Sequence, residues 1–347
     1  MLPLRPAVLA ASLACALALT GFSSSHAAAP VSPKKILFFS KSSAFEHQVI
    51  KERPGRPSFA TQVLRALGPQ HGIEFTCTKD GSLLTADYLA QFDAFFFYTS
   101  GDLLAPGTDG QPPMTPAGKQ ALLAAIRGGK GFIGTHAAAD TFHAGETVAT
   151  DTKQLRTWRY RQLGEKADPY TRMIGGELII HGTQQVARVR VADPKFPGLA
   201  GRGDSIEAQD EWYSMTNFAP DLHVLLVLDP AAMRDPNANG KDWPPAGWDT
   251  PYQRPPYPVT WARREGQGRV FYTAMGHSEE TWRSALFQEI LFGGIDWALG
   301  RAAADVTPNL ARVAPRAAEL PPVSGPVAGL PPALKAKEPQ TPDHTYP

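Results

Sequence analysis

The sequence has very little cysteine and no excess of either charge, and its only long apolar run lies near its start. Of two cysteines among 347 residues, Cys15 lies in that run and Cys77 is the only one beyond it. A single cysteine cannot close an intramolecular disulfide, so a hydrophobic core must hold the fold. The 34 basic and 33 acidic residues nearly balance and form no basic stripe. Nucleic acid is therefore not an expected partner.

The first 27 residues have the features of a secretory signal peptide. Arg5 precedes an apolar run over residues 7–19, and Ser25-His26-Ala27 supplies the small residues of a cleavage site. The run is too short to span a bilayer, and no later segment is apolar enough to do so. We therefore expect an exported chain, periplasmic or secreted, that begins at Ala28 and has no membrane span.

The next hundred residues alternate between two hydrophobic patterns. Short continuous apolar runs at 36–39, 94–98 and 131–134 suit strands that are buried on both faces of a parallel sheet. Helical periodicity lies between them at 59–67 and, after Thr115-Pro116, at 116–127. The alternation predicts an α/β domain over residues 34–300. Its sheet should be doubly wound, mostly parallel and flavodoxin-like, with helices on both faces.

The second half of the chain is less regular. Residues 258–263 and 269–273 flank Glu265-Gly266-Gln267-Gly268 and predict a β-hairpin. A final helix is expected over 279–299. From residue 305 to residue 347 prolines recur without apolar periodicity, which predicts a disordered, proline-rich tail.

Four histidines follow apolar runs: His47, His136, His181 and His277. In a doubly wound sheet, ligands bind at the carboxyl ends of the strands. A lone loop histidine is most often structural, but the joint pattern predicts one shared pocket. Divalent metal binding and metal-free acid–base chemistry both suit such a group.

An acidic pair precedes two aromatic residues in Asp210-Glu211-Trp212-Tyr213. The carboxylates could brace a turn. Alternatively, they could accept hydrogen bonds from sugar hydroxyls while the two rings stack on the pyranose. Both interpretations stay open from the sequence.

Taken in order, these segments resemble the ThuA-like (trehalose-utilisation) family over Lys35 to about Leu299. The motifs that carry the resemblance are the Phe45/His47 loop, residues 129–136 with Asp140-Thr141-Phe142, Gly175-Gly176 with His181 and Gln184, residues 210–213, Pro258-Val259-Thr260-Trp261, residues 268–272, and Gly276-His277. The chain departs from the family at Gly182, where proline is typical, and at Tyr257, where histidine is frequent. The second departure puts in doubt any role of that additional histidine.

The resemblance implies a fold like that of the class I glutamine amidotransferases. Those enzymes carry a nucleophilic cysteine at the sharp turn after the strand that ends here at Gly134. This chain has Thr135-His136 at that turn, and Cys77 lies on another strand. Glutaminase chemistry, which needs an activated thiolate, is therefore not expected.

The resemblance also implies carbohydrate catabolism acting on a keto-disaccharide or glycoside. Cleavage of a C–O bond and isomerisation of a keto-sugar are both consistent with it. A non-catalytic exported carbohydrate-binding protein is the alternative. The expected catalytic residues are His136, His277, Glu211 and Asp210. The expected substrate contacts are His47, Asp140, Gln184, Trp212 and Tyr213. A zinc or manganese ion, if one binds, would be held by His47, His136, His181 and His277.

Overall fold

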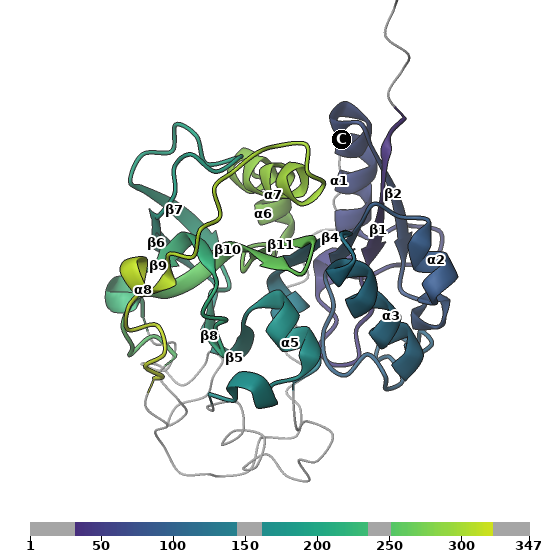
Figure 1. Ribbon diagram of the computed structural model, residues 1–347, viewed down its shortest axis with the longest axis horizontal. Coiled ribbons are helices and arrows are strands. Elements are labelled where there is room, and N and C mark those ends of the chain that lie inside the picture. Colours follow the sequence, from purple (N-terminus) through teal and green to yellow (C-terminus); the bar gives the residue numbers. More distant parts are fainter. Residues whose placement is uncertain (1–31, 144–161, 235–250, 322–347) are drawn as a thin grey trace, which may run out of the picture. The chain divides into compact units, whose positions relative to one another are not determined.

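A computed structural model describes residues 32–143, 162–234 and 251–321 (Figure 1). Five parallel strands lie in the order β2-β1-β3-β4-β11. Their bounds are β1 Lys34–Phe39, β2 Ile73–Thr78, β3 Ala94–Phe97, β4 Gly131–Thr135 and β11 Gly268–Thr273. The predicted apolar runs form the inner strands, and Phe38, Phe96 and Ile133 are fully buried. The predicted α/β class with a mostly parallel core is confirmed.

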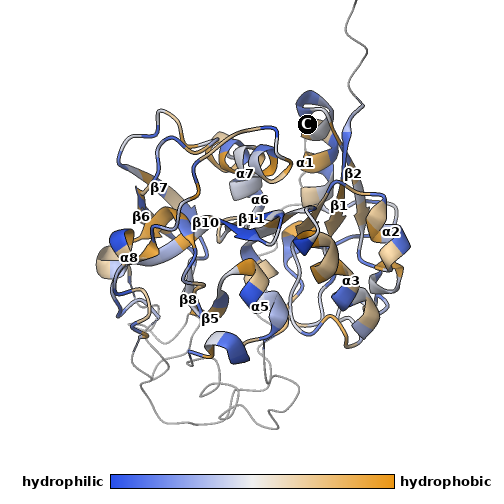
Figure 2. Cartoon of the chain, viewed as in Figure 1, coloured by the Kyte–Doolittle hydropathy of each residue, from blue (hydrophilic) through white to orange (hydrophobic). Residues whose placement is uncertain are grey.

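Helices cover both faces of this parallel half (Figure 1). One layer contains α1, α6 and α7, and the other contains α2, α3 and α5. The bounds are α1 Phe59–Leu67, α2 Ala86–Ala90, α3 Pro116–Arg127, α5 Pro169–Ile174, α6 Glu279–Arg283 and α7 Ala285–Ala298. The expected last helix is divided at Ser284, whose extended backbone ends α6 and whose hydroxyl caps α7. In Figure 2, α3 carries polar and apolar residues side by side, as a helix packed on a sheet should.

Four antiparallel strands extend the sheet beyond β11, in the order β10-β9-β6-β7. Their bounds are β6 Gln185–Val191, β7 Ser205–Asp210, β9 His223–Leu228 and β10 Tyr257–Glu265. The predicted hairpin is the β10–β11 pair, and Gly266 at its turn has φ +59°. A separate two-stranded sheet pairs β5 Glu177–His181 with β8 Tyr213–Thr216.

The segment after residue 305 packs on the antiparallel half, so the predicted tail is wrong for its first part. The Asn309 side chain donates to the carbonyl oxygen of Val224 at 3.1 Å and accepts from the Val224 amide at 2.7 Å. Helix α8, Leu310–Val313, follows, and Val313 and Ala317 are buried. Isolated apolar residues dock here without helical periodicity in the sequence. Residues 322–347 of the predicted tail and the predicted signal peptide lie outside the described residues.

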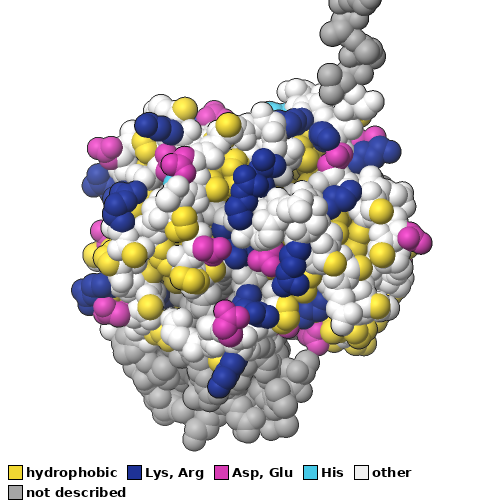
Figure 3. All heavy atoms as spheres, in the orientation of Figure 1, with side chains coloured by type: hydrophobic (Ala, Val, Ile, Leu, Met, Phe, Trp, Pro, Cys, Tyr) yellow, Lys and Arg dark blue, Asp and Glu magenta, His cyan; other side chains and the backbone are white. Residues whose placement is uncertain are grey.

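The described surface shows no segregation of charge on the face in Figure 3, where basic and acidic side chains are interspersed. Among the described residues, no helix is both long enough and apolar enough to cross a bilayer. That finding agrees with the expectation from the sequence.

Candidate functional site

Three histidines meet at the carboxyl edge of the parallel strands. His47 follows β1, His136 directly follows β4, and His277 follows β11. The ring centroid of His47 lies 4.8 Å from that of His136 and 5.2 Å from that of His277, and the His136 and His277 centroids are 5.2 Å apart. The three strands are parallel, so their carboxyl ends share one edge. The expected convergence of these side chains is therefore what the structure shows.

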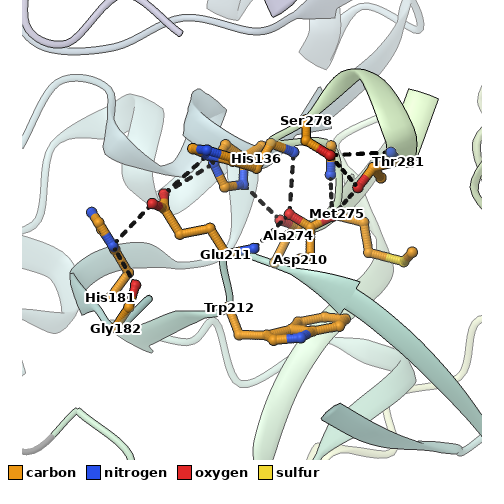
Figure 4. Close-up of polar contacts among 12 residues, drawn as sticks. His136, His181, Gly182, Asp210, Glu211, Trp212, Ala274, Met275, Ser278 and Thr281 are labelled. Atoms are coloured by element: carbon orange, nitrogen blue, oxygen red, sulfur yellow. Dashed lines mark hydrogen bonds and ion pairs between the residues drawn. The ribbon is translucent and has the colours of Figure 1, made fainter. Parts of the chain in front are cut away.

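Glu211 supplies the carboxylate of this cluster from the turn between β7 and β8. Its Oε2 lies 3.2 Å from Nδ1 of His277 and 3.5 Å from Nε2 of His136, and its Oε1 lies 3.3 Å from Nδ1 of His181. Figure 4 shows the Glu211 side chain reaching between His136 and His181. We call His47, His136, His277 and Glu211 the histidine centre.

The contacts of the histidine centre show which atoms its ring nitrogens face. Nδ1 of His136 lies 2.9 Å from the carbonyl oxygen of Ala274. A carbonyl can only accept, so Nδ1 carries a proton, while Nε2 faces Nδ1 of His277 at 3.2 Å and Oε2 of Glu211 at 3.5 Å. Nδ1 of His47 is buried without a hydrogen-bond partner among the described residues. The ring nitrogens of the centre are thus directed at one another and at a single carboxylate.

Burial and neighbouring charges shift the pKa values in this centre. Burial, reinforced by His136 and His277, holds the pKa of His47 well below 6.5. Burial acts to raise the pKa of Glu211, but the nearby His181 and His277 and hydrogen bonds from His136 and His277 outweigh it. The pKa of Glu211 therefore lies well below its usual range. At neutral pH the centre holds one carboxylate beside at least one uncharged imidazole.

The donor set of the histidine centre suits a divalent cation. One ligand atom from each of the four residues lies within 4.8 Å of all the others. Three nitrogens and one oxygen are ligands that zinc and manganese accept. The His136 Nδ1–H group bonded to a carbonyl is the outer contact that metal-bound histidines generally have.

His181 lies beside this ligand set and not within it. Its Nδ1 is 2.9 Å from the carbonyl oxygen of Gly182, and its link to the centre is the contact with Glu211. Its side chain is 25% exposed, more than that of His136 or His277. The geometry therefore places His181 on the more exposed side of the centre, outside the group of four that could share one metal ion.

Asp210 points away from the histidines, towards Thr281 (Figure 4). Its carboxylate accepts hydrogen bonds from the amides of Gly276 at 2.8 Å and His277 at 3.2 Å, and from the Thr281 hydroxyl at 3.1 Å. These bonds fix the loop that carries His277. Asp210 is thus a positioning residue and does not have the expected catalytic place.

The aromatic pair after Glu211 is buried, contrary to the expected stacking role. Trp212 is fully buried, points away from the histidines in Figure 4, and donates its indole N–H to Gln185 O at 3.1 Å. The ring centroid of Tyr213 lies 4.2 Å from that of His136, but the side chain is only 1% exposed. Tyr213 is a wall of the centre, and Trp212 supports the core beneath it.

The two remaining expected substrate contacts are not among the four residues of the histidine centre. Gln184 is exposed between β5 and β6. Asp140 Oδ1 lies 2.6 Å from Nε2 of His143, whose Nδ1 is 3.1 Å from Oε2 of Glu177. We call Asp140, His143 and Glu177 the acidic triad. No sequence pattern indicated a role for Glu177, which is the first residue of β5.

Tyr98 is a further residue of the site that the sequence interpretation missed. It is fully buried after β3, its ring centroid lies 5.4 Å from that of His47, and its hydroxyl donates to Gly276 O at 3.1 Å. Tyr98 ends the apolar run at 94–98, so the rule that selected the histidines could also have selected it.

Comparison with known proteins places the chain in a family. The family model "ThuA: Trehalose utilisation" matches residues 35–298, and the chain belongs to this family. A solved ThuA-like protein from Bacteroides uniformis is 21% identical, with a TM-score of 0.54, over 79% of this chain and 94% of that one. Another, from Parabacteroides merdae, is 17% identical, with a TM-score of 0.47, over 79% of this chain and 92% of that one. The comparison with curated proteins gave no match.

Proposed function

We propose that this chain is an exported enzyme of carbohydrate catabolism that acts on a 3-keto-glycoside. The observation that carries the proposal is the histidine centre, where lone pairs and one carboxylate converge at the ligand-binding edge of the sheet. A site of this kind can remove a weakly acidic proton and stabilise the negative charge that develops on oxygen.

A ketone at C3 of a sugar ring acidifies the proton on C2. A base removes that proton, and the electron pair of the C2–H bond forms an enolate with the C3 oxygen. The enolate then either expels the glycosidic oxygen at C1, which leaves as an alcohol after it gains a proton, or takes up a proton at C3 while the proton of the C2 hydroxyl moves to the C3 oxygen, which places the ketone at C2. Neither route needs an oxidant or a reductant.

The same residues would hold a divalent cation, zinc or manganese. His47, His136, His277 and Glu211 would be its ligands, and the cation would supply Lewis-acid stabilisation of the enolate oxygen. With those four residues engaged, His181 is the histidine left to move a proton, held by its contacts with Gly182 and Glu211.

The test is turnover of methyl 3-keto-α-glucoside and 3-keto-trehalose, followed by NMR of the products, together with metal analysis of the purified protein. We expect His136→Ala to lower turnover at least 100-fold. His71→Ala is the matched control, because His71 lies before β2 and stacks on Phe292, away from the centre. Saturable sugar binding without turnover would instead favour the carbohydrate-binding alternative.

Export is a separate part of the proposal and has its own test. The apolar run at 7–19 and the Ser25-His26-Ala27 site support cleavage after Ala27. N-terminal sequencing of protein from the periplasm or the medium should begin at Ala28. Protein that keeps Met1 and stays in the cytoplasm would contradict export.

A further inference from the structure

One aromatic side chain beside the histidine centre is turned towards solvent. Phe45 is 45% exposed, and its ring centroid lies 4.9 Å from that of His47 in an edge-to-face arrangement. The large hydrophobic side chains that are exposed in the described part of the chain are Phe45, Leu83 and Val186. Phe45 is the aromatic one among them, and it lies at the site.

The backbone around Phe45 is anchored on both sides. The Phe45 carbonyl accepts from the buried Ser100 hydroxyl at 2.7 Å, and the Ala44 carbonyl accepts from Thr108 Oγ1 at 2.6 Å. The carboxylate of Glu46 pairs with Lys79 at 3.0 Å, and the Lys79 side chain is nearly buried. The ring is therefore held out on a fixed loop, and holding it there costs little further ordering when a ligand binds.

Among the described residues, the other rings near the centre have almost no surface open to a ligand. Tyr98, Trp212, Tyr213 and Tyr272 are each at most 1% exposed. A pyranose has apolar C–H faces and polar edges, and pockets for such ligands combine an apolar surface with a few polar groups. Here the partly exposed His181 and Glu211 supply polar groups, and Phe45 supplies the apolar surface.

We propose that Phe45 is the platform on which the pyranose ring of the substrate stacks at the entrance to the histidine centre. This inference rests on the proposed function for the class of ligand. It assigns to Phe45 the stacking role that the sequence interpretation gave to Trp212 and Tyr213. Because phenylalanine carries no polar group, the contact selects an apolar sugar face and leaves the hydroxyls to His181 and Glu211.

The experiment compares Phe45→Ala, Phe45→Leu and Phe45→Trp with Leu83→Ala, a matched change at an exposed apolar position elsewhere. Phe45→Ala and Phe45→Leu should raise KM for methyl 3-keto-α-glucoside about tenfold, equivalent to about 1.4 kcal/mol. They should leave kcat within about twofold, and metal content unchanged. Phe45→Trp should restore KM, and Leu83→Ala should have no effect.

Saturation-transfer NMR with unoxidised methyl α-glucoside separates this inference from the proposed function. Binding that depends on Phe45 without turnover of any keto-sugar would support the platform and contradict the enzymatic proposal. Normal turnover with an unchanged KM in Phe45→Ala would contradict the platform alone. A loss of both kcat and bound metal would show that Phe45 only supports His47. That result would also overturn the platform.

Discussion

Two buried histidine clusters in this protein have opposite balances of imidazole and carboxylate. In the histidine centre three imidazoles surround one carboxylate, whereas in the acidic triad one imidazole lies between two carboxylates. Both nitrogens of His143 face carboxylate oxygens, so that imidazole can donate twice and satisfy its neighbours. In the histidine centre, one carboxylate is shared among His136, His277 and the adjacent His181. The comparison teaches that the first cluster is suited to bind something and the second to hold the fold together.

The largest effect should come from Glu211→Gln, which removes the one negative charge of the histidine centre. We expect turnover to fall about 10³-fold, within the range typical for groups that assist proton transfer, and bound divalent cation to be lost. The melting temperature should also fall, because in the folded protein the contacts of that carboxylate with the neighbouring histidines outweigh the cost of its burial. Steady-state kinetics, plasma mass spectrometry and calorimetry measure the three quantities. Turnover within tenfold of the wild type would contradict the central role of Glu211.

The change His143→Leu should lower the free energy of unfolding and leave metal content unchanged. It removes the partner that the part-buried Asp140 and the buried Glu177 share, and breaking a buried pair costs about 3–5 kcal/mol. Denaturant unfolding measures the loss. Adding Glu177→Gln should recover part of it, because one of the two stranded charges disappears. Equal stability of His143→Leu and the wild type would mean that the triad does not hold the fold.

Asp210→Asn should have an intermediate effect and distinguishes the two adjacent acidic residues. The amide keeps one acceptor oxygen but turns an NH₂ group towards amide donors, so we expect a loss of about 1–3 kcal/mol. Turnover should fall less than in Glu211→Gln, through misplacement of His277. If Asp210→Asn left stability unchanged and removed turnover as completely as Glu211→Gln, Asp210 would be catalytic after all.

The smallest effect is a pH dependence of stability in chelator-treated protein. The pKa of His47 is lowered in the folded state, so below about pH 6.5 the unfolded chain binds a proton that the folded chain does not. Stability should therefore decrease as the pH falls from 6.5 to 5, with a limiting slope of about 1.4 kcal/mol per pH unit. Glu211 adds a second decrease below about pH 4.5. His47→Gln should reduce the slope of stability against pH between 6.5 and 5. An unchanged slope in that variant would contradict this account.

The sequence predicted the parallel half of the fold and the three histidines because both depend on local pattern. Buried parallel strands are continuous apolar runs, and the residue after each run must lie at the carboxyl edge. The roles of Asp210 and Glu211 could not be predicted in this way. Neighbouring residues at a strand end point to opposite sides, and which side faces the histidines depends on pairing with distant segments.

The errors have similar physical causes. An aromatic pair beside acidic residues has the same composition whether it stacks on a sugar or fills a core, and Trp212 is buried because Tyr252 and Gln185 close around it. The segment from residue 305 lacks periodicity, yet Asn309 replaces a strand partner for Val224. Such contacts are set by tertiary structure and leave no periodic pattern in the sequence.

His136 has φ +46°, a left-handed backbone conformation that residues with a Cβ rarely adopt. The turn after β4 therefore keeps a strained geometry in order to aim an imidazole at the centre, and the surrounding fold bears a cost of about 1–3 kcal/mol. Stability and activity oppose each other at this position. A selection for thermal stability alone should accept glycine at residue 136, and the stabilised protein would have lost the centre of its site.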